Sequence, residues 1–392
     1  MYDTIMTDLV DTILAPPGKA QDALVFAYGQ TGTGKTHTML GPDASLSRAA
    51  PANGCIDEDW GCFPRVVYNV WDRLKSSEQP FVLSISAAEF YLMTGGDLLA
   101  DNKPIVASLQ TGEPLGLKQV ILQEPSQVLD VLAVIRKNRH TRSTKMNQSK
   151  GDHQGSSRGH ASILLRVSRI ETESGVLIET ALNLIDLAGA ERPSKIGVKR
   201  MSGYDAMIEI MNNPEKVSTD AQASLINFEL HLLGTEVVTA TQAHKTGSKP
   251  YKPQGLLNSV GMCALGSSLT GRAKIAIVVT LSQAEDCGWE TWFSCQFGTN
   301  LSKLMTPRLL RQPSPVRVVV KGSIETLVDL RKNLAIKTVG DKYRFKRECT
   351  AQHELERLLV LRELLNTILP KEDLDKLFAP LQALEQNEEG KN

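Results

Sequence analysis

The sequence lacks the features that mark secreted, metal-binding and membrane proteins. Its six cysteines form no C-x-x-C pair and have no histidine pair near them at the spacing of a metal site. No apolar run approaches the length of a membrane span, and the N-terminus has no charged-then-apolar targeting pattern. We therefore expect a cytoplasmic protein with free thiols. The cysteines are Cys55, Cys62, Cys263, Cys287, Cys295 and Cys349.

The chain also lacks an excess of charge of either sign. Lys and Arg total 44, as do Asp and Glu, so the formal net charge is zero. The field of the whole chain therefore argues neither for nor against a polyanionic partner, and electrostatic docking has to come from local patches. The 392 residues give room for one large α/β domain with a smaller appendage, or for two domains of ordinary size.

The most informative stretch runs from Ala23 to Gly41, ALVFAYGQTGTGKTHTMLG, and joins an apolar strand, a glycine-rich turn and a helix start. It matches the phosphate-loop pattern G-x-x-x-x-G-K-[ST], in which backbone N–H groups surround phosphate oxygens and glycines permit the close approach. Lys35 would reach the β- and γ-phosphates, Thr36 would offer its hydroxyl to Mg²⁺, and the positive helix end would favour the anion. The alternative is a chance Gly/Thr-rich loop, which the flanking strand and helix patterns disfavour. The expected nucleotide-binding residues are Gly29, Gln30, Thr31, Gly32, Thr33, Gly34, Lys35 and Thr36.

Hydrophobic periodicity predicts the elements around this loop. Helices are expected over residues 1–15 and 63–74, and a third, capped by Ser126, is expected to end near Arg139. Strands are expected over 81–92, 163–170 and 176–185, the last two as an antiparallel hairpin. Residues 94–116 are expected to form a hairpin or loop.

An acidic residue follows the last of these strands. Asp186 comes directly after the apolar run ALNLI, and Gly189 lies three residues further on, in DLAGAE. A phosphate-loop enzyme holds its magnesium through water from an acidic residue at this position. We therefore expect Asp186 to lie beside the phosphate loop.

Together these residues resemble a kinesin motor domain. The phosphate loop, the segment SSRGH at Ser156 to His160 (the first switch) and the segment DLAGAE at Asp186 to Glu191 (the second switch) follow in the family's order and approximate spacing. Weaker matches, among them KNRHTRSTKMN and LINFELHLLG, extend the resemblance over Tyr2 to Leu304. The resemblance implies a three-layer α/β phosphate-loop fold with a central, mostly parallel sheet flanked by helices. It also implies a motor domain over 1–304, lacking its first strands, and a linker with a small helical extension over 305–392.

The resemblance assigns roles to individual residues. The serines of SSRGH would lie by the γ-phosphate, with Ser157 near the metal and the attacking water. Asp186 would hold Mg²⁺ through water, and the Gly189 N–H would sense the γ-phosphate. Arg158 and Glu191 would form the ion pair that closes the two switches over the reacting water. The expected catalytic residues are Ser156, Ser157, Arg158, Asp186, Gly189 and Glu191, and the expected metal ligands are Thr36, Ser157 and Asp186.

A kinesin-like function is what the resemblance implies. It would be an ATP-dependent microtubule motor of the cytoskeleton, with ATP and Mg²⁺ as cofactors and tubulin, not nucleic acid, as partner. Two loops ordered by the γ-phosphate would serve as catalyst and sensor. The helix matched by Ala223 to Ala240 would carry the change to the microtubule surface. A non-motile, nucleotide-regulated microtubule-binding protein and an unrelated phosphate-loop NTPase stay open as alternatives.

Two departures from the family's pattern concern the nucleotide site. The family's opening strand, with its Arg-x-Arg-Pro adenine contact, would precede Met1 and is missing, so we expect an uncovered sheet edge. About six extra residues lie between Asn147 and Ser156, and they make the first switch harder to order. Gly159 and Ala190 stand where the family has serine, so we expect slower hydrolysis.

Other departures concern the tubulin-facing and C-terminal parts. The segment Asn227–Glu229 (NFE) replaces Asn-Lys-Ser, which exchanges a base for an apolar group and adds an acid. Because tubulin's surface is acidic, we expect weaker docking. Beyond Met305, prolines mark a linker, Val316–Val320 is expected to form a short strand, and Glu354–Leu369 is expected to form an amphipathic helix.

Overall fold

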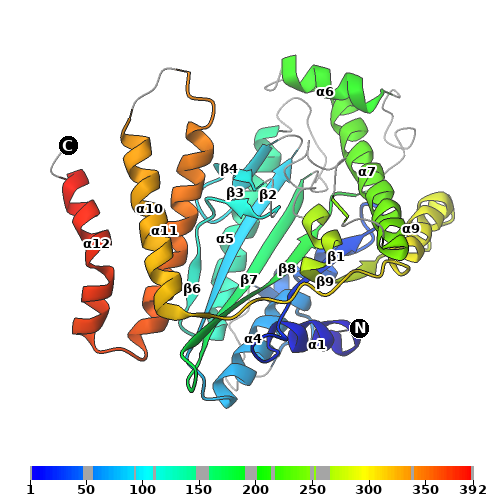
Figure 1. The fold of residues 1–392 in the computed structure, drawn as a ribbon. Coiled ribbons are helices and arrows are strands. Elements are labelled where there is room, and N and C mark those ends of the chain that lie inside the picture. Colours follow the sequence, from blue (N-terminus) through cyan, green and yellow to red (C-terminus); the bar gives the residue numbers. More distant parts are fainter. Residues whose placement is uncertain are drawn as a thin grey trace.

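A mixed β-sheet with helices on both faces forms the centre of the molecule (Figure 1). The computed structural model describes residues 2–46, 56–91, 94–108, 112–146, 159–189, 201–212, 217–247, 251–252, 265–336 and 340–389. Four cysteines in these ranges, Cys62, Cys287, Cys295 and Cys349, form no disulfide in the described structure. Among the helices of the described ranges, none has the length and apolarity that crossing a bilayer would require.

The ten strands of the sheet are ordered β5-β4-β3-β2-β7-β8-β1-β9, with β6 paired to β2 and β10 to β8. Around the phosphate loop, β8, β1 and β9 are parallel, whereas β7 runs antiparallel to both β8 and β2. The predicted three-layer α/β fold is therefore confirmed, with a sheet that is parallel near the loop and antiparallel in its other half. The strands are β1 Asp22–Tyr28, β2 Phe81–Tyr91, β3 Thr94–Asp97, β4 Lys103–Ala107, β5 Pro114–Leu115, β6 Val120–Leu122, β7 His160–Glu171, β8 Val176–Asp186, β9 Ala273–Val279 and β10 Ser314–Pro315.

Alternation along β1 explains why helices cover both faces of the sheet. Successive side chains of a strand point to opposite faces. One set packs against α1 (Tyr2–Ile13), α4 (Cys62–Ser76) and α5 (Val128–Met146), and the other packs against α7 (Thr219–Thr246) and α9 (Gly288–Leu301). Both sets are buried, so β1 forms a continuous apolar run. The first set is Ala23, Val25 and Ala27, and the second is Leu24, Phe26 and Tyr28.

At one end of the strand order, β9 pairs with β1 alone among the described residues. The expected uncovered edge stays a prediction. The predicted helices over 1–15 and 63–74, the strand over 81–92 and the hairpin of β7 and β8 are confirmed.

The predicted N-cap at Ser126 is wrong. Ser126 lies inside a 3₁₀ turn, Pro125–Gln127, and its hydroxyl donates to Oε1 of Glu124 at 2.6 Å. Proline is well suited to the first position of a helical turn, because its φ is already helical and it has no N–H to satisfy. The turn therefore begins at Pro125, and α5 continues from Val128 to Met146, past the predicted end.

The predicted strand Val316–Val320 is also wrong. Only β10 pairs with β8 there, and Val316 begins the helix α10 (Val316–Ala335). Val320, Ile324 and Leu327 recur at helical spacing and are all buried, so packing outweighs the strand preference of the valines. The predicted amphipathic helix over 354–369 is confirmed as the second half of α11 (Arg344–Asn366).

The helices α10, α11 and α12 (Lys371–Glu389) cover the sheet face that also carries α7 (Figure 1). Their apolar core includes Val82 of β2, Ile170 of β7 and Leu177 of β8. The Arg357 guanidinium of α11 forms an ion pair with Glu179 of β8. The helices are thus bound to the sheet itself, and the predicted domain division at residue 304 stays a prediction.

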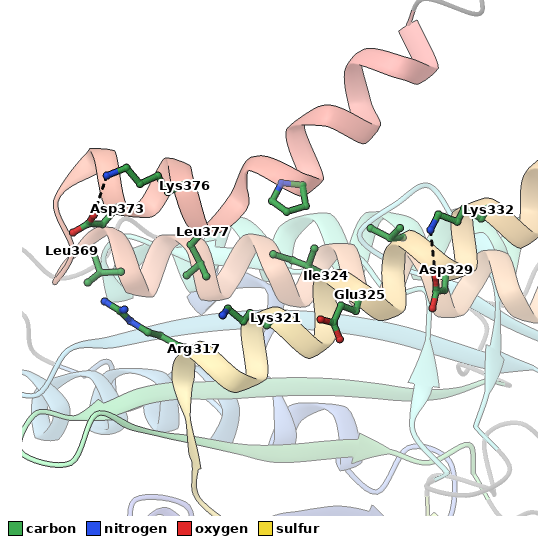
Figure 2. A pocket seen from close by; sticks show the side chains of 12 residues that line it. Arg317, Lys321, Ile324, Glu325, Asp329, Lys332, Leu369, Asp373, Lys376 and Leu377 are labelled. Atoms are coloured by element: carbon green, nitrogen blue, oxygen red, sulfur yellow. Dashed lines mark ion pairs between the residues drawn. The ribbon is translucent and has the colours of Figure 1, made fainter.

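Within this layer α12 is held less closely than α11. A groove of about 870 Å³ lies between α10 and α12. Figure 2 shows Ile324 and Leu377 among the side chains that line it, together with charged side chains. The ion pairs drawn there, Lys332 with Asp329 and Lys376 with Asp373, each lie within one helix. The contact between α10 and α12 therefore depends on apolar packing.

The packing of α11 predicts a large difference between two leucines of the same helix. Leu361→Ala removes a fully buried side chain and should lower the free energy of unfolding by about 2–5 kcal/mol. Leu359→Ala, at a side chain that is 45% exposed, should lower it by less than about 1 kcal/mol. Urea unfolding followed by circular dichroism measures both. Equal, small losses would contradict the docking of α11 on the sheet.

Candidate nucleotide-binding site

The phosphate loop follows β1 and leads into the short helix α2 (Lys35–Met39). Gly32 and Gly34 have φ of 80° and 93°, in the left-handed region that favours glycine. At Gly29 the reason for glycine is space, because a Cβ there would lie 2.3 Å from the Thr280 carbonyl oxygen. The loop conformation thus depends on Gly29 and Gly34, which the sequence motif requires, and on Gly32 between them.

The segment after β9 supports the loop from one side. Thr33 Oγ1 lies 2.6 Å from Thr280 Oγ1, and the Gln30 side-chain amide donates to the Cys287 sulfur at 3.2 Å. Neither Thr280 nor Cys287 was expected at the site, because they follow the loop by about 250 residues and belong to no phosphate-binding motif. Only the parallel pairing of β9 with β1 brings them to the loop.

Lys35 lies inside the loop that precedes it. Its side chain is buried, and Nζ donates to the carbonyl oxygens of Gly29 at 3.0 Å and Gln30 at 2.9 Å. These two hydrogen bonds hold the positively charged ammonium group at the centre of the turn. Phosphate oxygens bound in the loop would contact it there.

Thr36 and Asp186 meet at the carboxyl ends of two parallel strands. The pairing of β1 with β8 sets Ala27 opposite Asp186, and Thr36 Oγ1 donates to Asp186 Oδ2 at 2.6 Å. Asp186 is 2% exposed, and its Oδ1 is buried without a hydrogen bond from any described residue. A hydroxyl, a carboxylate and an orphaned carboxylate oxygen suit Mg²⁺, which prefers hard oxygen ligands and keeps several waters. The residues therefore fit the implied metal.

Arg139 of α5 is a further charged residue of this site. It is buried, with Nη1 3.1 Å from Asp186 Oδ2 and Nε 3.5 Å from Glu89 Oε1. Burial alone would lower the pKa of Arg139, but Asp186 and Glu89 raise it above its ordinary value. The guanidinium is thus a permanent cation beside the expected magnesium position. The sequence signal was weak, since a basic residue near a helix end is usually solvent-exposed.

The described part of the second switch lies against the phosphate loop. A Cβ on Gly189 would be 2.0 Å from Thr31 Oγ1, so the two segments are in direct contact. A Cβ on Gly159 would be 2.9 Å from Glu89 Oε1, so Glu89 occupies the space that a serine would need there. The expected catalytic residues Ser156, Ser157, Arg158 and Glu191 lie outside the described residues, as does Ala190.

The acid in the segment NFE does not lie on the surface. The sequence predicts Glu229 to be an added acid on a tubulin-facing helix, but it is 3% exposed and its Oε2 lies 3.4 Å from His160 Nε2. Phe228 is partly buried beside α6 (Gly203–Asn212), whose Gly203 leaves room for the ring. The segment therefore faces inward and toward α6, and its acid adds no surface charge.

Removing Arg139 should destabilise the whole fold. Arg139→Ala leaves the buried carboxylates of Asp186 and Glu89 without their shared cation, and we expect a loss of about 3–5 kcal/mol in the free energy of unfolding. Lys137→Ala, at an exposed position of the same helix, should change it by no more than about 0.5 kcal/mol. Urea unfolding compares the two. A loss below about 1 kcal/mol for Arg139→Ala would show that these charges do not depend on one another.

Comparison with known proteins identifies the family. The family model for the kinesin motor domain matches residues 1–304. Kinesin-like protein KIN-5C of Arabidopsis thaliana is 28% identical over 348 residues, which is 83% of this chain and 31% of that protein. Kinesin-like protein Klp61F of Drosophila melanogaster is 26% identical over 395 residues, which is 95% of this chain and 34% of that protein.

A solved structure of a fast kinesin has the same fold. Its TM-score is 0.61 at 24% sequence identity, over 80% of this chain and 78% of that one. The chain spans about a third of the length of the curated relatives that it matches. The phosphate loop, the aspartate at the end of β8 and the match over residues 1–304 agree, and the chain belongs to the kinesin motor-domain family.

Proposed function

We propose that this chain binds ATP with Mg²⁺ and hydrolyses the ATP to drive microtubule-based movement. Kinesin motor domains generally are ATPases, and the family is shown by the match over residues 1–304. The observation that carries the proposal is the meeting of Lys35, Thr36 and Asp186 at the carboxyl ends of β1 and β8. Parallel strands that end at one edge form the usual nucleotide crevice of such folds.

Each of these three residues has a role in phosphoryl transfer. Lys35 would neutralise the β- and γ-phosphates, the Thr36 hydroxyl would be a metal ligand, and Asp186 would hold the metal through water. The bound Mg²⁺ supplies neutralisation of the charge that develops on the triphosphate. The loop backbone orients the phosphates, so most of the catalysis consists of positioning.

The two switches complete the site. Ser156, Ser157 and Arg158 would approach the γ-phosphate from one side, and Glu191 would pair with Arg158 over the attacking water. The described residues of the two switches support this role, because the Ala188 N–H of the second switch donates to His160 Nδ1 of the first at 3.0 Å. The two segments therefore leave the sheet from points that are bound to each other.

Tubulin is the proposed partner, with a location on microtubules. The curated relatives are named kinesin-like proteins, and the solved fast kinesin was described for its ATPase mechanism and its interactions with microtubules. Transfer of this partner to the present chain rests on the shared motor-domain family.

A second candidate function is a non-motile, nucleotide-regulated microtubule-binding protein. The observation that favours it is the fixed path of the segment after α9. The Leu309 N–H donates to the Gly271 oxygen at 3.0 Å, the Arg311 N–H donates to the Ala20 oxygen at 2.8 Å, and the Arg311 side chain pairs with Asp22. Movement needs a segment that changes position with nucleotide state, and this one is bound to the rest of the molecule at Leu309 and Arg311.

Cosedimentation with microtubules, together with ATP turnover, separates the two functions. We expect tighter binding in AMP-PNP than in ADP, by about 5-fold or more, because an ordered γ-phosphate site biases the switches. A motor should also hydrolyse ATP faster when microtubules are added. Binding without turnover would support the non-motile function, and absence of both binding and turnover would overturn the proposal.

Glu191→Ala tests the catalytic assignment. The loop residues that bind ATP are unchanged, so we expect the affinity for a fluorescent ATP analogue to stay within about 3-fold while turnover falls roughly 100-fold or more. Glu173→Ala, in the exposed turn between β7 and β8, is the matched control and should leave both unchanged. Undiminished turnover in Glu191→Ala would remove this residue from the mechanism.

A further inference from the structure

A buried imidazole joins three elements around the phosphate loop. His160, the first residue of β7, is 3% exposed, and its Nδ1 accepts a 3.0 Å hydrogen bond from the Ala188 N–H in the second switch. Its Nε2 lies 3.4 Å from Oε2 of Glu229 on α7, and the Glu229 side chain is also 3% exposed. One ring nitrogen therefore contacts the second switch, and the other faces α7.

The hydrogen bond from Ala188 fixes the tautomer of the ring. A backbone N–H can only donate, so His160 Nδ1 carries no proton and the ring's proton lies on Nε2, facing Glu229. At 3.4 Å this contact is an electrostatic pair just outside hydrogen-bond geometry. A small approach of α7 toward His160 would make the hydrogen bond, and a small retreat would weaken the pair.

The same switch segment rests on the phosphate loop. Gly189 follows Ala188, and the position of its missing Cβ is 2.0 Å from Thr31 Oγ1. A displacement of the loop therefore reaches Gly189 by direct contact, Ala188 through the chain, and Glu229 through the His160 ring. His160 and Glu229 are buried, so solvent does not screen the pair strongly.

We propose that Glu229 is a positioning residue that couples α7 to the nucleotide site through His160. By holding the proton-bearing side of the ring, its carboxylate fixes the Ala188–Gly189 segment in the position that senses the γ-phosphate. The inference rests on the proposed function, since it concerns how nucleotide state reaches α7. Serine, which the family has at this position, is shorter and uncharged, so the contact described here depends on the glutamate of this chain.

The test compares Glu229→Ala with Glu229→Gln. We expect Glu229→Ala to bind ATP within about 3-fold of the native chain, because no loop residue changes, but to reduce the ratio of microtubule affinities in AMP-PNP and ADP by about 5-fold or more. Glu229→Gln keeps an oxygen that accepts from Nε2–H and should retain the ratio within about 2-fold. An unchanged ratio in Glu229→Ala would overturn the proposal, as would a glutamine variant as impaired as the alanine variant.

Glu236→Ala is the matched control on the same helix. Glu236 is also buried, and among the described residues it accepts a hydrogen bond from the Tyr251 hydroxyl. The variant loses a buried carboxylate of α7 as Glu229→Ala does, yet it should keep the native affinity ratio. If Glu236→Ala lowered the ratio equally, the effect would come from destabilised α7 packing, and the assignment to Glu229 would be overturned.

Two measurements that need no microtubules keep this inference separate from the proposed function. In protein labelled with ¹⁵N-histidine, the His160 signal, assigned by its loss in His160→Gln, should show a protonated Nε2 and an unprotonated Nδ1, and it should shift in Glu229→Ala. Hydrogen exchange of α7 amides should differ between AMP-PNP and ADP in the native chain and in Glu229→Gln, but not in Glu229→Ala.

These outcomes decide each claim independently. A native chain that binds nucleotide but not microtubules would refute the proposed function, and the exchange difference in α7 would still support or overturn the coupling. The opposite tautomer, or equal exchange differences in the native chain and Glu229→Ala, would overturn the coupling while leaving the motor function intact. A chain that binds no nucleotide would overturn both.

Discussion

The parallel pairing of β1 with β8 is the constraint on which the nucleotide site depends. It sets Ala27 opposite Asp186, so the end of β8 lies level with the point where the phosphate loop leaves β1. Thr36 then lies close enough to donate to Asp186 at 2.6 Å. A one-residue slip in this register would turn Asp186 to the opposite face of the sheet, because side chains alternate along a strand. The buried apolar sequence of β1 and its helices on both faces hold the register.

Burial makes the charges at this edge depend on one another. Four charged side chains here are at most 8% exposed: Lys35, Arg139, Asp186 and Glu89. A buried charge is tolerated only when it is paired or hydrogen-bonded. Arg139 is therefore as much a part of the site as the loop lysine. One oxygen of the Asp186 carboxylate, Oδ2, is contacted both by Arg139 Nη1 and by the Thr36 hydroxyl. The other carboxylate oxygen, Oδ1, accepts no hydrogen bond from a described residue, so it is the oxygen that would hold a magnesium-bound water.

The sequence predicts the parts of the site that belong to a local sequence pattern. The phosphate loop is predictable because its strand, glycines and lysine follow one another in the sequence. Asp186 is predictable because the last residue of a parallel strand lies at the carboxyl end of the sheet, where such folds bind their ligands. Arg139, Glu89 and the pair of His160 with Glu229 are not, since each contact joins elements whose placement depends on the whole sheet. Three consecutive valines favour a strand locally, yet Val318 to Val320 lie in α10 because Val320 packs with α11 in one apolar core. The sequence does not contain that tertiary context in any local pattern.

The C-terminal helices limit which elements can move when the nucleotide site changes its conformation. Two elements lead away from it: α7, contacted through His160, and the segment after α9. The segment after α9 is held in place by backbone hydrogen bonds at Leu309 and Arg311. The helix α11 that follows it is held by the ion pair of Arg357 with Glu179. Freeing the segment after α9 would break these backbone hydrogen bonds and the ion pair of Arg311 with Asp22, whereas a small shift of α7 breaks none of them. The fold therefore favours α7 as the element that responds to nucleotide, with the C-terminal layer acting as a fixed support.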